Sequence, residues 1–317
     1  MIIIQLAGGL GNQMFQYALY LQLKSLGKEV KIDDWTGFAQ DAQREPSLMP
    51  FGINYERATI KELEQMLDSA PGLWSKVHRK LFGRNKKAYF EADKRYKPEI
   101  MSWDDIYLEG YWQTDKYFRS VSEEVKRAYD VDRLLEYVRE AGGKSAQESR
   151  GKNKSHSLEE VAETKRTLFE RYLTQITSTE SVSVHIRRGD YLLPQNQALF
   201  GNICTETYYR KAMRQMKQEY PQCRFYLFTN DKQWIKEQLA GVTDAIEVVD
   251  IGEQSDYSEF ILMSKCRHNI LANSSFGWWA SYLNRNQDKT VFAPDRWLNG
   301  WDCLDFYRDD MRKITVG

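Results

Sequence analysis

The sequence predicts an α/β protein built on parallel sheets, and two observations carry this prediction. Apolar runs typical of strands alternate with helical segments at both ends of the chain. Residues 2–6 are expected to form a buried strand, 14–26 a helix and 28–33 a second strand, which together make a β-loop-α-β unit. Polar side chains suited to ligand binding follow several strands, and doubly wound sheets bind ligands at the carboxyl ends of their strands.

Length and composition indicate a soluble globular chain with two domains. Its 317 residues exceed what one hydrophobic core usually serves, so two domains of about 150 residues are expected. We place them at 1–150 and 151–317 because residues 141–157 are polar and rich in Gly, Ser and Lys. The 45 Lys and Arg balance 45 Asp and Glu, which argues against broad nucleic-acid binding.

Cysteine usage and hydropathy favour a cytoplasmic protein. Cys204, Cys223, Cys266 and Cys303 are widely spaced without a C-x-x-C pair, which fits reduced thiols better than disulfides or a zinc site. No apolar stretch approaches the roughly 18 residues that span a bilayer, and no signal-peptide pattern opens the chain. We therefore expect no stable membrane insertion.

The remaining elements follow the same alternation of strand and helix. Residues 55–140 are expected to be mostly helical, and a capping-box pattern of Ser157 with Glu160 begins a helix that runs toward Thr174. Further strands are expected at 182–187, 224–229, 246–250, 268–272 and 291–294. Helices are expected at 205–218, 232–239, from Ser255 or Asp256 to Cys266, and at Trp278–Tyr282.

The most informative motif is the run His185-Ile186-Arg187-Arg188-Gly189-Asp190 at the end of a predicted strand. Apolar and polar residues alternate over 182–187, which indicates a strand with one buried face. The strand delivers two guanidiniums and a carboxylate into a glycine turn, and the planar guanidinium suits bidentate binding of phosphate oxygens. We interpret the motif as a site for an anion, with a diphosphate as the leading candidate. Surface ion pairs that close a loop are the alternative.

A second candidate anion site is the run Asn273-Ser274-Ser275-Phe276-Gly277, between a predicted strand and a predicted helix. Backbone N–H groups at a helix N-terminus favour a negative charge. The alternative is an ordinary N-cap by Ser274 or Ser275. Together with residues 185–190, this run would place two phosphate-binding features at one edge of one sheet.

Three further polar residues follow strands: Asn230, Asp231 and Asp256. An Asp carboxylate can accept two hydrogen bonds from the N1–H and N2–H₂ edge of a guanine, with helix capping as the alternative. Near the N-terminus, Asn12 and Gln13 follow three glycines and are expected either to contact a ligand or to cap the helix. A nicotinamide coenzyme has little support there, because the third glycine of the dinucleotide fingerprint is missing.

Four other features have weaker functional support. Asp130-Val131-Asp132 matches the D-x-D letters of a metal-dependent sugar transferase, but it stands in a region expected to be helical, and Asp309-Asp310 is no better. We therefore predict no metal and no cofactor. Arg188-Gly189-Asp190 spells an adhesion tripeptide, but it closes a buried strand in a chain without a signal peptide. His268, at a strand start, is expected to be structural.

Taken together, these motifs resemble the α-1,2-fucosyltransferases of glycosyltransferase family 11. The blocks that carry the resemblance occur in order from residue 3 to about 284, and they are Gly8–Ala18, His185–Tyr191, Phe228–Asp231, Asp256–Cys266 and Asn273–Trp279. Residues 141–165 are less familiar and are expected to be a local insertion.

The resemblance implies a GT-B architecture, in which two Rossmann-like domains face a central cleft. Under it, the N-terminal domain with its helical insert serves the acceptor, and the C-terminal domain holds GDP-β-L-fucose. It implies inverting, metal-independent transfer of fucose to O2 of a terminal β-galactoside. Gly11, Asn12 and Gln13 would then lie on the fucose side, across the cleft from the donor domain. The expected partners are GDP-fucose and a galactose-terminated oligosaccharide, and a homo-oligomer stays open.

The motifs and the resemblance together give the expected roles of individual residues, and the resemblance itself places Arg187 and Arg188 at the diphosphate. The expected donor-binding set is His185, Arg187, Arg188, Asn230, Asp231, Asp256, Asn273, Ser274, Ser275 and Phe276. The expected catalytic set is Arg187, Arg188, Asn12 and Asp190. For a general base, Asp190 and Glu206 are candidates, and an SN1-like departure without a strong base is the third option.

Animal members carry a membrane anchor that this chain lacks. A bacterial cytoplasmic enzyme that makes surface glycans is therefore expected, at most peripheral at the inner membrane. Two alternatives stay open. One is a GT-B glycosyltransferase with another donor or linkage, and the other is a non-catalytic protein that binds nucleotides or glycans.

Overall fold

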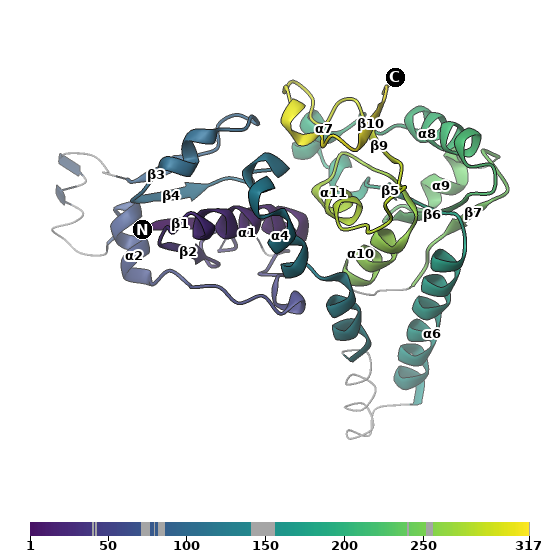
Figure 1. Cartoon of the computed structure of the whole chain (residues 1–317), viewed down its shortest axis with the longest axis horizontal. Coiled ribbons are helices and arrows are strands. Elements are labelled where there is room, and N and C mark those ends of the chain that lie inside the picture. The colour runs from purple at the N-terminus through teal and green to yellow at the C-terminus, as the bar shows by residue number, and fades with distance from the viewer. Residues whose placement is uncertain are drawn as a thin grey trace. The chain divides into compact units, whose positions relative to one another are not determined.

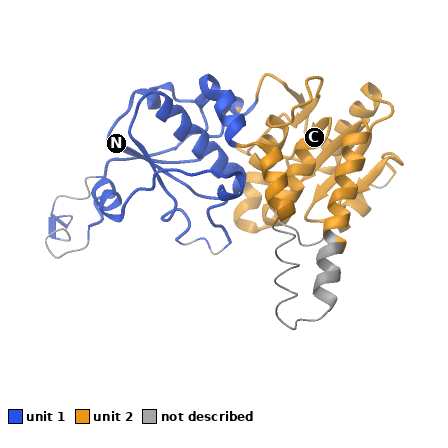
Figure 2. Cartoon of the chain, turned by 60° about the horizontal axis from the view of Figure 1, so that its bottom comes forward, with its two compact units in different colours: residues 1–128, 304–307 blue, residues 129–303, 308–317 orange. Residues whose placement is uncertain are grey.

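The computed structural model describes residues 1–39, 41, 43–70, 77–78, 80–81, 86–140, 156–239, 241–251 and 256–316, without the side chains of 156–163 and 165. The chain forms two compact units. Unit 1 comprises Met1–Ala128 with Leu304–Tyr307, and unit 2 comprises Tyr129–Cys303 with Arg308–Gly317 (Figure 2).

The division after Ala128 differs from the boundary expected at 150, which falls outside the described residues. The helical residues 131–140 belong to unit 2, and side chains just before this segment and near its end contact the rest of that unit. The Tyr129 ring packs edge-on against Trp279 at a centroid distance of 5.2 Å. Arg139 binds both carboxylate oxygens of Glu170, at 2.7 and 2.8 Å.

Unit 1 is built on a four-stranded parallel sheet in the order β2-β1-β4-β3. Its strands are β1 (Ile2–Gln5), β2 (Val30–Asp33), β3 (Ala88–Phe90) and β4 (Ile106–Glu109), and its α-helices include α1 (Leu10–Ser25), α2 (Ile60–Leu67) and α4 (Ser122–Ala128). The β-loop-α-β unit predicted at the N-terminus is confirmed.

The expectation that residues 55–140 are mostly helical is wrong for two strands of this sheet, β3 and β4. Each has only three or four residues, which is too short for a period-two pattern to stand out. The segment 304–307 completes unit 1, since Asp305 accepts a hydrogen bond from the Tyr96 backbone N at 2.8 Å and pairs with Lys116.

Unit 2 is built on a six-stranded parallel sheet in the order β10-β9-β8-β5-β6-β7 (Figure 1). Its strands are β5 (Ser181–Ile186), β6 (Arg224–Thr229), β7 (Ile246–Val248), β8 (His268–Ile270), β9 (Val291–Pro294) and β10 (Met311–Ile314). Its α-helices include α6 (His156–Ser178), α7 (Pro194–Phe200), α8 (Glu206–Glu219), α9 (Lys232–Gln238), α10 (Asp256–Lys265) and α11 (Ser275–Tyr282).

The predicted α/β class with two parallel-sheet units, the building blocks of a GT-B enzyme, is confirmed. The strands and helices predicted for the second half are found, and α7 and β10 are additions. All six residues of β5 are buried between β6 and β8, so the chain leaves this central strand directly into the motif at 187–190. The predicted capping box of Ser157 and Glu160 lies outside the described side chains.

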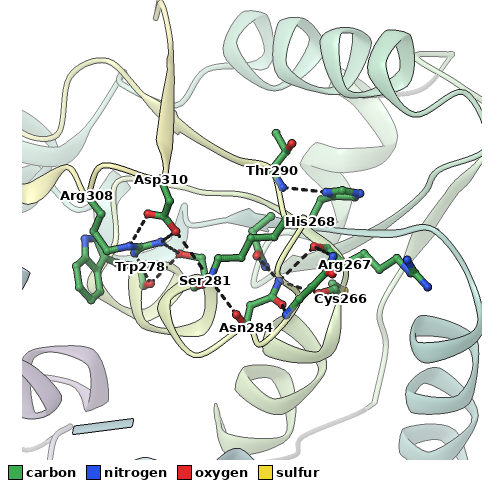
Figure 3. Close-up of polar contacts among 12 residues, drawn as sticks. Cys266, Arg267, His268, Trp278, Ser281, Asn284, Thr290, Arg308 and Asp310 are labelled. Carbon is green, nitrogen blue, oxygen red and sulfur yellow. Dashed lines mark hydrogen bonds and ion pairs between the residues drawn. The ribbon is translucent and has the colours of Figure 1, made fainter. Parts of the chain in front are cut away.

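The C-terminal end of α11 is held by two cations (Figure 3). Arg308 is buried, donates to the Trp278 carbonyl at 3.1 Å and to Ser281 Oγ at 3.0 Å, and is paired with Asp310. Lys289 donates to the Ser281 carbonyl at 2.9 Å. Positive charge stabilises the carbonyl end of a helix, so these contacts fix α11 from its far end.

His268 is structural, as expected from the sequence. Its Nδ1 accepts the Thr290 backbone N–H at 3.0 Å, so Nε2 carries the proton and donates to Glu180 Oε1 at 2.7 Å. Burial lowers the pKa of the His268 ring. Within the described part of the chain, no helix is both long and apolar enough to cross a membrane.

Candidate functional site

Arg187 and Asp190 face each other in the loop that follows β5. Arg187 Nε and Nη2 donate to the two carboxylate oxygens of Asp190 at 2.8 and 2.9 Å. The Arg187 guanidinium carbon also lies 6.0 Å from the centre of the Tyr191 ring. A bidentate pair fixes the plane of a guanidinium, so Asp190 orients Arg187 while both side chains stay about a third exposed, at 31% and 32%.

Arg188 is held by residues that follow the neighbouring strand β6. Its Nε donates to Asp231 Oδ2 at 3.0 Å, and its guanidinium carbon lies 4.5 Å from the centre of the Trp234 ring. Asn230 Oδ1 accepts the backbone N–H groups of Arg188 and Gly189, both at 3.3 Å. A Cβ on Gly189 would stand 2.2 Å from Asn230 Nδ2, so a side chain at this position would force Asn230 to shift.

Asp231 therefore has two structural tasks. Its Oδ1 caps α9 by accepting the Trp234 backbone N–H at 3.0 Å, and its Oδ2 holds Arg188. The backbone hydrogen bond, followed by the Arg188 side chain, holds the pKa of Asp231 below its usual range. The sequence offered capping as one of two alternatives for this residue, and the structure shows capping together with orientation of an arginine.

His185 lies at the carboxyl end of β5, against the first turn of α11. Its ring is 6% exposed, and its centroid lies 5.7 Å from that of Phe276. A Cβ on Gly277 would stand 2.8 Å from His185 Nδ1, so the glycine lets the helix approach the ring. Burial, and then the charge of Arg187, lowers the pKa of His185 to about 3. The ring is therefore neutral at neutral pH, and among the described residues its Nδ1 has no hydrogen-bond partner.

The loop between β8 and α11 meets the loop after β5 through Tyr191. The Tyr191 hydroxyl donates to the Asn273 carbonyl at 2.9 Å, and its ring stacks on Phe200 at 4.7 Å. Ser274 caps α11 through its Oγ, which accepts the Phe276 backbone N–H at 3.4 Å. The two candidate anion sites of the sequence thus lie at one edge of the sheet, linked by a hydrogen bond.

Asn273 is held by contacts within unit 2, and its role in donor binding stays a prediction. Its side chain is buried, and Nδ2 donates to the Trp297 carbonyl at 3.1 Å and to the Phe200 carbonyl at 3.4 Å. Its amide is therefore used to fix the loop, because both of its N–H groups point at backbone carbonyls. Ser275 and Phe276 remain half-buried at the start of α11.

Glu259 on α10 is a carboxyl near the charges of the arginine motif, and the sequence did not single it out. Burial, and then repulsion by Asp256 one turn earlier, raises the pKa of Glu259 to about 7, while the charges of Arg187 and Lys232 lower it. Glu259 is thus a half-buried carboxyl whose pKa depends in part on the charge of Arg187. A lone carboxylate beside the apolar run Phe260–Met263 was the available signal. Asp256 itself is exposed at the first residue of the helix.

In unit 1, Asn12 and Gln13 follow the glycine loop in the first turn of α1, and their side chains have different surroundings. Gln13 is fully buried: its Nε2 donates to the carbonyls of Gly8 and Glu45, both at 2.9 Å, and its Oε1 accepts the Ser47 backbone N–H at 2.7 Å. The Gln13 amide therefore holds the loop to residues 45–47, and its expected place on the fucose side stays a prediction. Gly11 is likewise buried in α1, whereas Asn12 stays half-exposed.

The remaining candidates take ordinary structural places. Asp132 pairs with Lys265 and Arg285, and Asp130 pairs with Arg285, so both D-x-D carboxylates bind cations of unit 2. Glu206 is the first residue of α8. Within the ranges that the structure describes, no three His, Cys, Asp or Glu side chains gather as a metal site would require.

Comparison with known proteins identifies the family. The description that matches the chain is "Glycosyl transferase family 11", over residues 1–300. The chain belongs to glycosyltransferase family 11. An Escherichia coli relative named O-antigen biosynthesis glycosyltransferase WbnK is 27% identical over 302 residues, covering 93% of this chain and 94% of the relative. The alpha-1,2-colitosyltransferase of E. coli is 26% identical, covering 95% of each chain.

Other known proteins are similar over shorter stretches of sequence or in structure. The galactoside alpha-(1,2)-fucosyltransferase 1 of Saimiri boliviensis boliviensis is 34% identical over 103 residues, covering 32% of this chain and 28% of that protein. A solved structure of Arabidopsis thaliana FUT1 in complex with GDP has a TM-score of 0.43 at 12% identity, covering 93% of this chain and 70% of that one. E. coli ADP-heptose LPS heptosyltransferase II has a TM-score of 0.42 at 14% identity, covering 99% and 90%.

Proposed function

We propose that this family 11 member transfers L-fucose, with inversion, from GDP-β-L-fucose to O2 of a terminal β-galactoside. The observation that carries the proposal is the pair of arginines after β5, each oriented by a carboxylate, Arg187 by Asp190 and Arg188 by Asp231. They lie at the carboxyl edge of the sheet, beside the first turn of α11. Two oriented guanidiniums and a helix N-terminus suit a diphosphate.

The arginines would act on the leaving group. As GDP departs, negative charge develops on the β-phosphate and the fucose takes on oxocarbenium character. Guanidiniums that are already oriented stabilise this charge without reorganising, an effect of roughly 3–4 kcal/mol for each well-placed donor. The neutral His185, whose Nδ1 has no partner among the described residues, would add a hydrogen bond without adding charge. We therefore propose that no metal is needed for departure.

For the base of the nucleotide, we propose a carboxylate of α10. The sequence named Asp256 as an acceptor for the N1–H and N2–H₂ edge of guanine. Glu259 is a second carboxyl able to take this part, because it lies on the same helix and within the electrostatic reach of Arg187. Asp231 is left out because both of its oxygens are engaged, by Trp234 and by Arg188.

Inversion requires the acceptor hydroxyl to attack from the face opposite GDP. Asp190 was one candidate for the general base, but both of its oxygens accept from Arg187, so we assign it to orienting that arginine. We propose that departure of GDP leads the reaction. We also propose that Asn12 of the glycine loop takes part in sugar transfer, and that the enzyme works in the bacterial cytoplasm.

A colitosyl donor is the second candidate. An E. coli relative named alpha-1,2-colitosyltransferase matches 95% of this chain, and colitose is fucose without its 3-hydroxyl. A site built for the 3-hydroxyl of fucose rejects the deoxy sugar strongly, because its polar partner is left unpaired. The ratio of the two transfer rates therefore decides between the donors.

The test is a transfer assay with purified protein, lactose and other β-galactosides, and labelled GDP-fucose, GDP-colitose, GDP-mannose or UDP-sugars, with EDTA present throughout. We expect fucose transfer that EDTA does not reduce, and an α-1,2 linkage in the NMR spectrum of the product. Faster transfer of colitose would favour the second candidate. Binding of GDP without turnover of any donor would indicate a non-catalytic binding protein.

A further inference from the structure

The oxygen and the nitrogen of the Asn12 side-chain amide both lie close to other residues of unit 1. On one side, Gln113 Nε2 donates a hydrogen bond to Asn12 Oδ1 at 2.7 Å, between residues 101 positions apart in the chain. On the other side, Asn12 Nδ2 lies so close to Gly8 that a Cβ there would stand 2.6 Å from it. Gly8 has a φ of +73°, which glycine adopts without strain. The carbonyl of the amide thus points at Gln113 and its nitrogen at the glycine loop.

The segment that carries Gln113 is itself fixed. It follows β4, and Gln16 of α1 donates to the Gly110 carbonyl at 2.8 Å while accepting the Ala7 backbone N–H at 3.0 Å. Gln16 thereby ties the loop after β4 to the loop after β1. Because the two loops are joined by a buried side chain, Gln113 meets Asn12 in a defined position.

A second buried side chain holds the same segment. Glu91 Oε2 accepts the backbone N–H groups of Tyr111 at 2.9 Å and Trp112 at 3.4 Å. Trp112 is fully buried and has a φ of +55°, an uncommon backbone conformation for a residue other than glycine. The chain changes direction sharply at Trp112, and this turn directs Gln113 back toward α1.

We propose that Gln113 is a positioning residue, which fixes the amide orientation of Asn12 for sugar transfer. The proposal rests on the proposed function, since it gives Asn12 a task in the reaction. An Asn side chain alone can rotate its amide by half a turn, which exchanges donor for acceptor. The hydrogen bond from Gln113 opposes this rotation, and a misplaced catalytic contact costs up to about 100-fold in rate.

A double-mutant cycle tests the coupling between the two residues. We expect Gln113→Ala to lower kcat by about 10- to 100-fold, with little change in KM for the donor, and Asn12→Ala to lower it further. The double variant should be no slower than Asn12→Ala, because Gln113 acts only through that residue. Gln65→Ala, an exposed glutamine of α2 in the same unit, is the matched control and should keep full activity.

A charge substitution separates positioning from packing. Gln113→Glu keeps the size of the side chain but replaces the donor by an acceptor, so the Asn12 amide should turn to donate. We expect kcat at neutral pH to fall at least as far as in Gln113→Ala. Activity relative to Gln113→Ala should recover as the pH falls toward 5, where the substituted carboxyl begins to carry a proton and can donate again. All variants should unfold within about 3 °C of wild type.

The outcomes distinguish failure of this inference from failure of the proposed function. Absence of any fucosyl transfer by the wild type would overturn the proposed function. The same cycle would then be run with whichever sugar nucleotide the wild type does use. The positioning role would be overturned if the fold losses in kcat of the two alanine substitutions multiply in the double variant. It would also be overturned if the loss of activity accompanies a loss of thermal stability. An unchanged kcat in Gln113→Ala would also overturn it.

Discussion

Arg187 and Asp190, three positions apart, meet through two parallel hydrogen bonds of 2.8 and 2.9 Å. Arg187→Ala and Arg188→Ala should each lower kcat/KM for fucosyl transfer at least about 100-fold, because the charge on the leaving diphosphate loses a donor. Asp190→Asn should cost less, about 10-fold, since the guanidinium remains but loses its fixed plane. In an Arg187→Ala background Asp190→Asn should add nothing, and steady-state kinetics of the four proteins would show this.

The contact between Gly277 and His185 predicts a strong effect of one methyl group. Gly277→Ala would place a Cβ 2.8 Å from His185 Nδ1, so the helix start or the ring must shift. We expect a loss of about 1–3 kcal/mol in the free energy of unfolding, measured by urea denaturation, together with weaker GDP binding. In the double variant, His185→Ala should remove most of the loss in the free energy of unfolding that Gly277→Ala causes alone. A stable Gly277→Ala protein with unchanged GDP affinity would contradict the geometry.

The pKa of Glu259, raised to about 7, predicts a pH-dependent stability. Between about pH 4.5 and 7 the folded protein binds this proton and the unfolded chain does not, so the contribution favours folding below pH 4.5 and is lost as the pH rises through 7. Glu259→Gln removes this loss. The free energy of unfolding of the variant minus that of wild type should therefore be larger at pH 8 than at pH 4.5, by on the order of 1–3 kcal/mol in urea denaturation.

The same variant tests the guanine assignment. If Glu259 binds guanine as proposed, Glu259→Gln should weaken GDP more than ADP or UDP in calorimetry, because a neutral amide accepts the guanine edge poorly. Asp256→Asn, on the same helix, is the competing candidate and is measured beside it. A larger loss of GDP affinity in Asp256→Asn would return the assignment to the residue that the sequence named.

Gln13 and Asn12 are adjacent in sequence, and the structure predicts opposite effects of their substitution. Gln13→Ala removes three hydrogen bonds that a buried side-chain amide makes to the backbone, and should lower the free energy of unfolding by on the order of 2–4 kcal/mol. Asn12→Ala should leave stability within about 1 kcal/mol and lower activity instead. Urea denaturation beside the transfer assay would separate the two roles.

Much of unit 2 could be predicted from the sequence because its signals are local. The strand 224–229 is found with the bounds that its apolar run suggested, and β5 and α10 agree to within a residue or two. β3 and β4 were missed because three or four residues hold no periodic pattern. They form strands because β1 and its neighbours supply hydrogen-bond partners, which is tertiary information.

The candidate site divides in the same way. The chemistry of Arg187, Arg188 and Asp231 is legible in the sequence, since charged residues directly after apolar strands have few structural uses. The sequence does not show which of these side chains pair, because the partner of Arg188 follows a different strand, 43 positions further on. Gln113 was out of reach for the same reason, since its contact with Asn12 depends on the fold of β4 beside β1.

The return of residues 304–307 to unit 1 has a consequence for any attempt to divide the protein. The chain passes between units at 128–129, at 303–304 and again at 307–308, so no single cut yields both units whole. A fragment that ends at Ala128 lacks Asp305, and with it the acceptor for the Tyr96 backbone N–H and the partner of Lys116. Residues 304–307 therefore belong with the first unit, and a fragment of unit 1 keeps these two contacts only if it includes them.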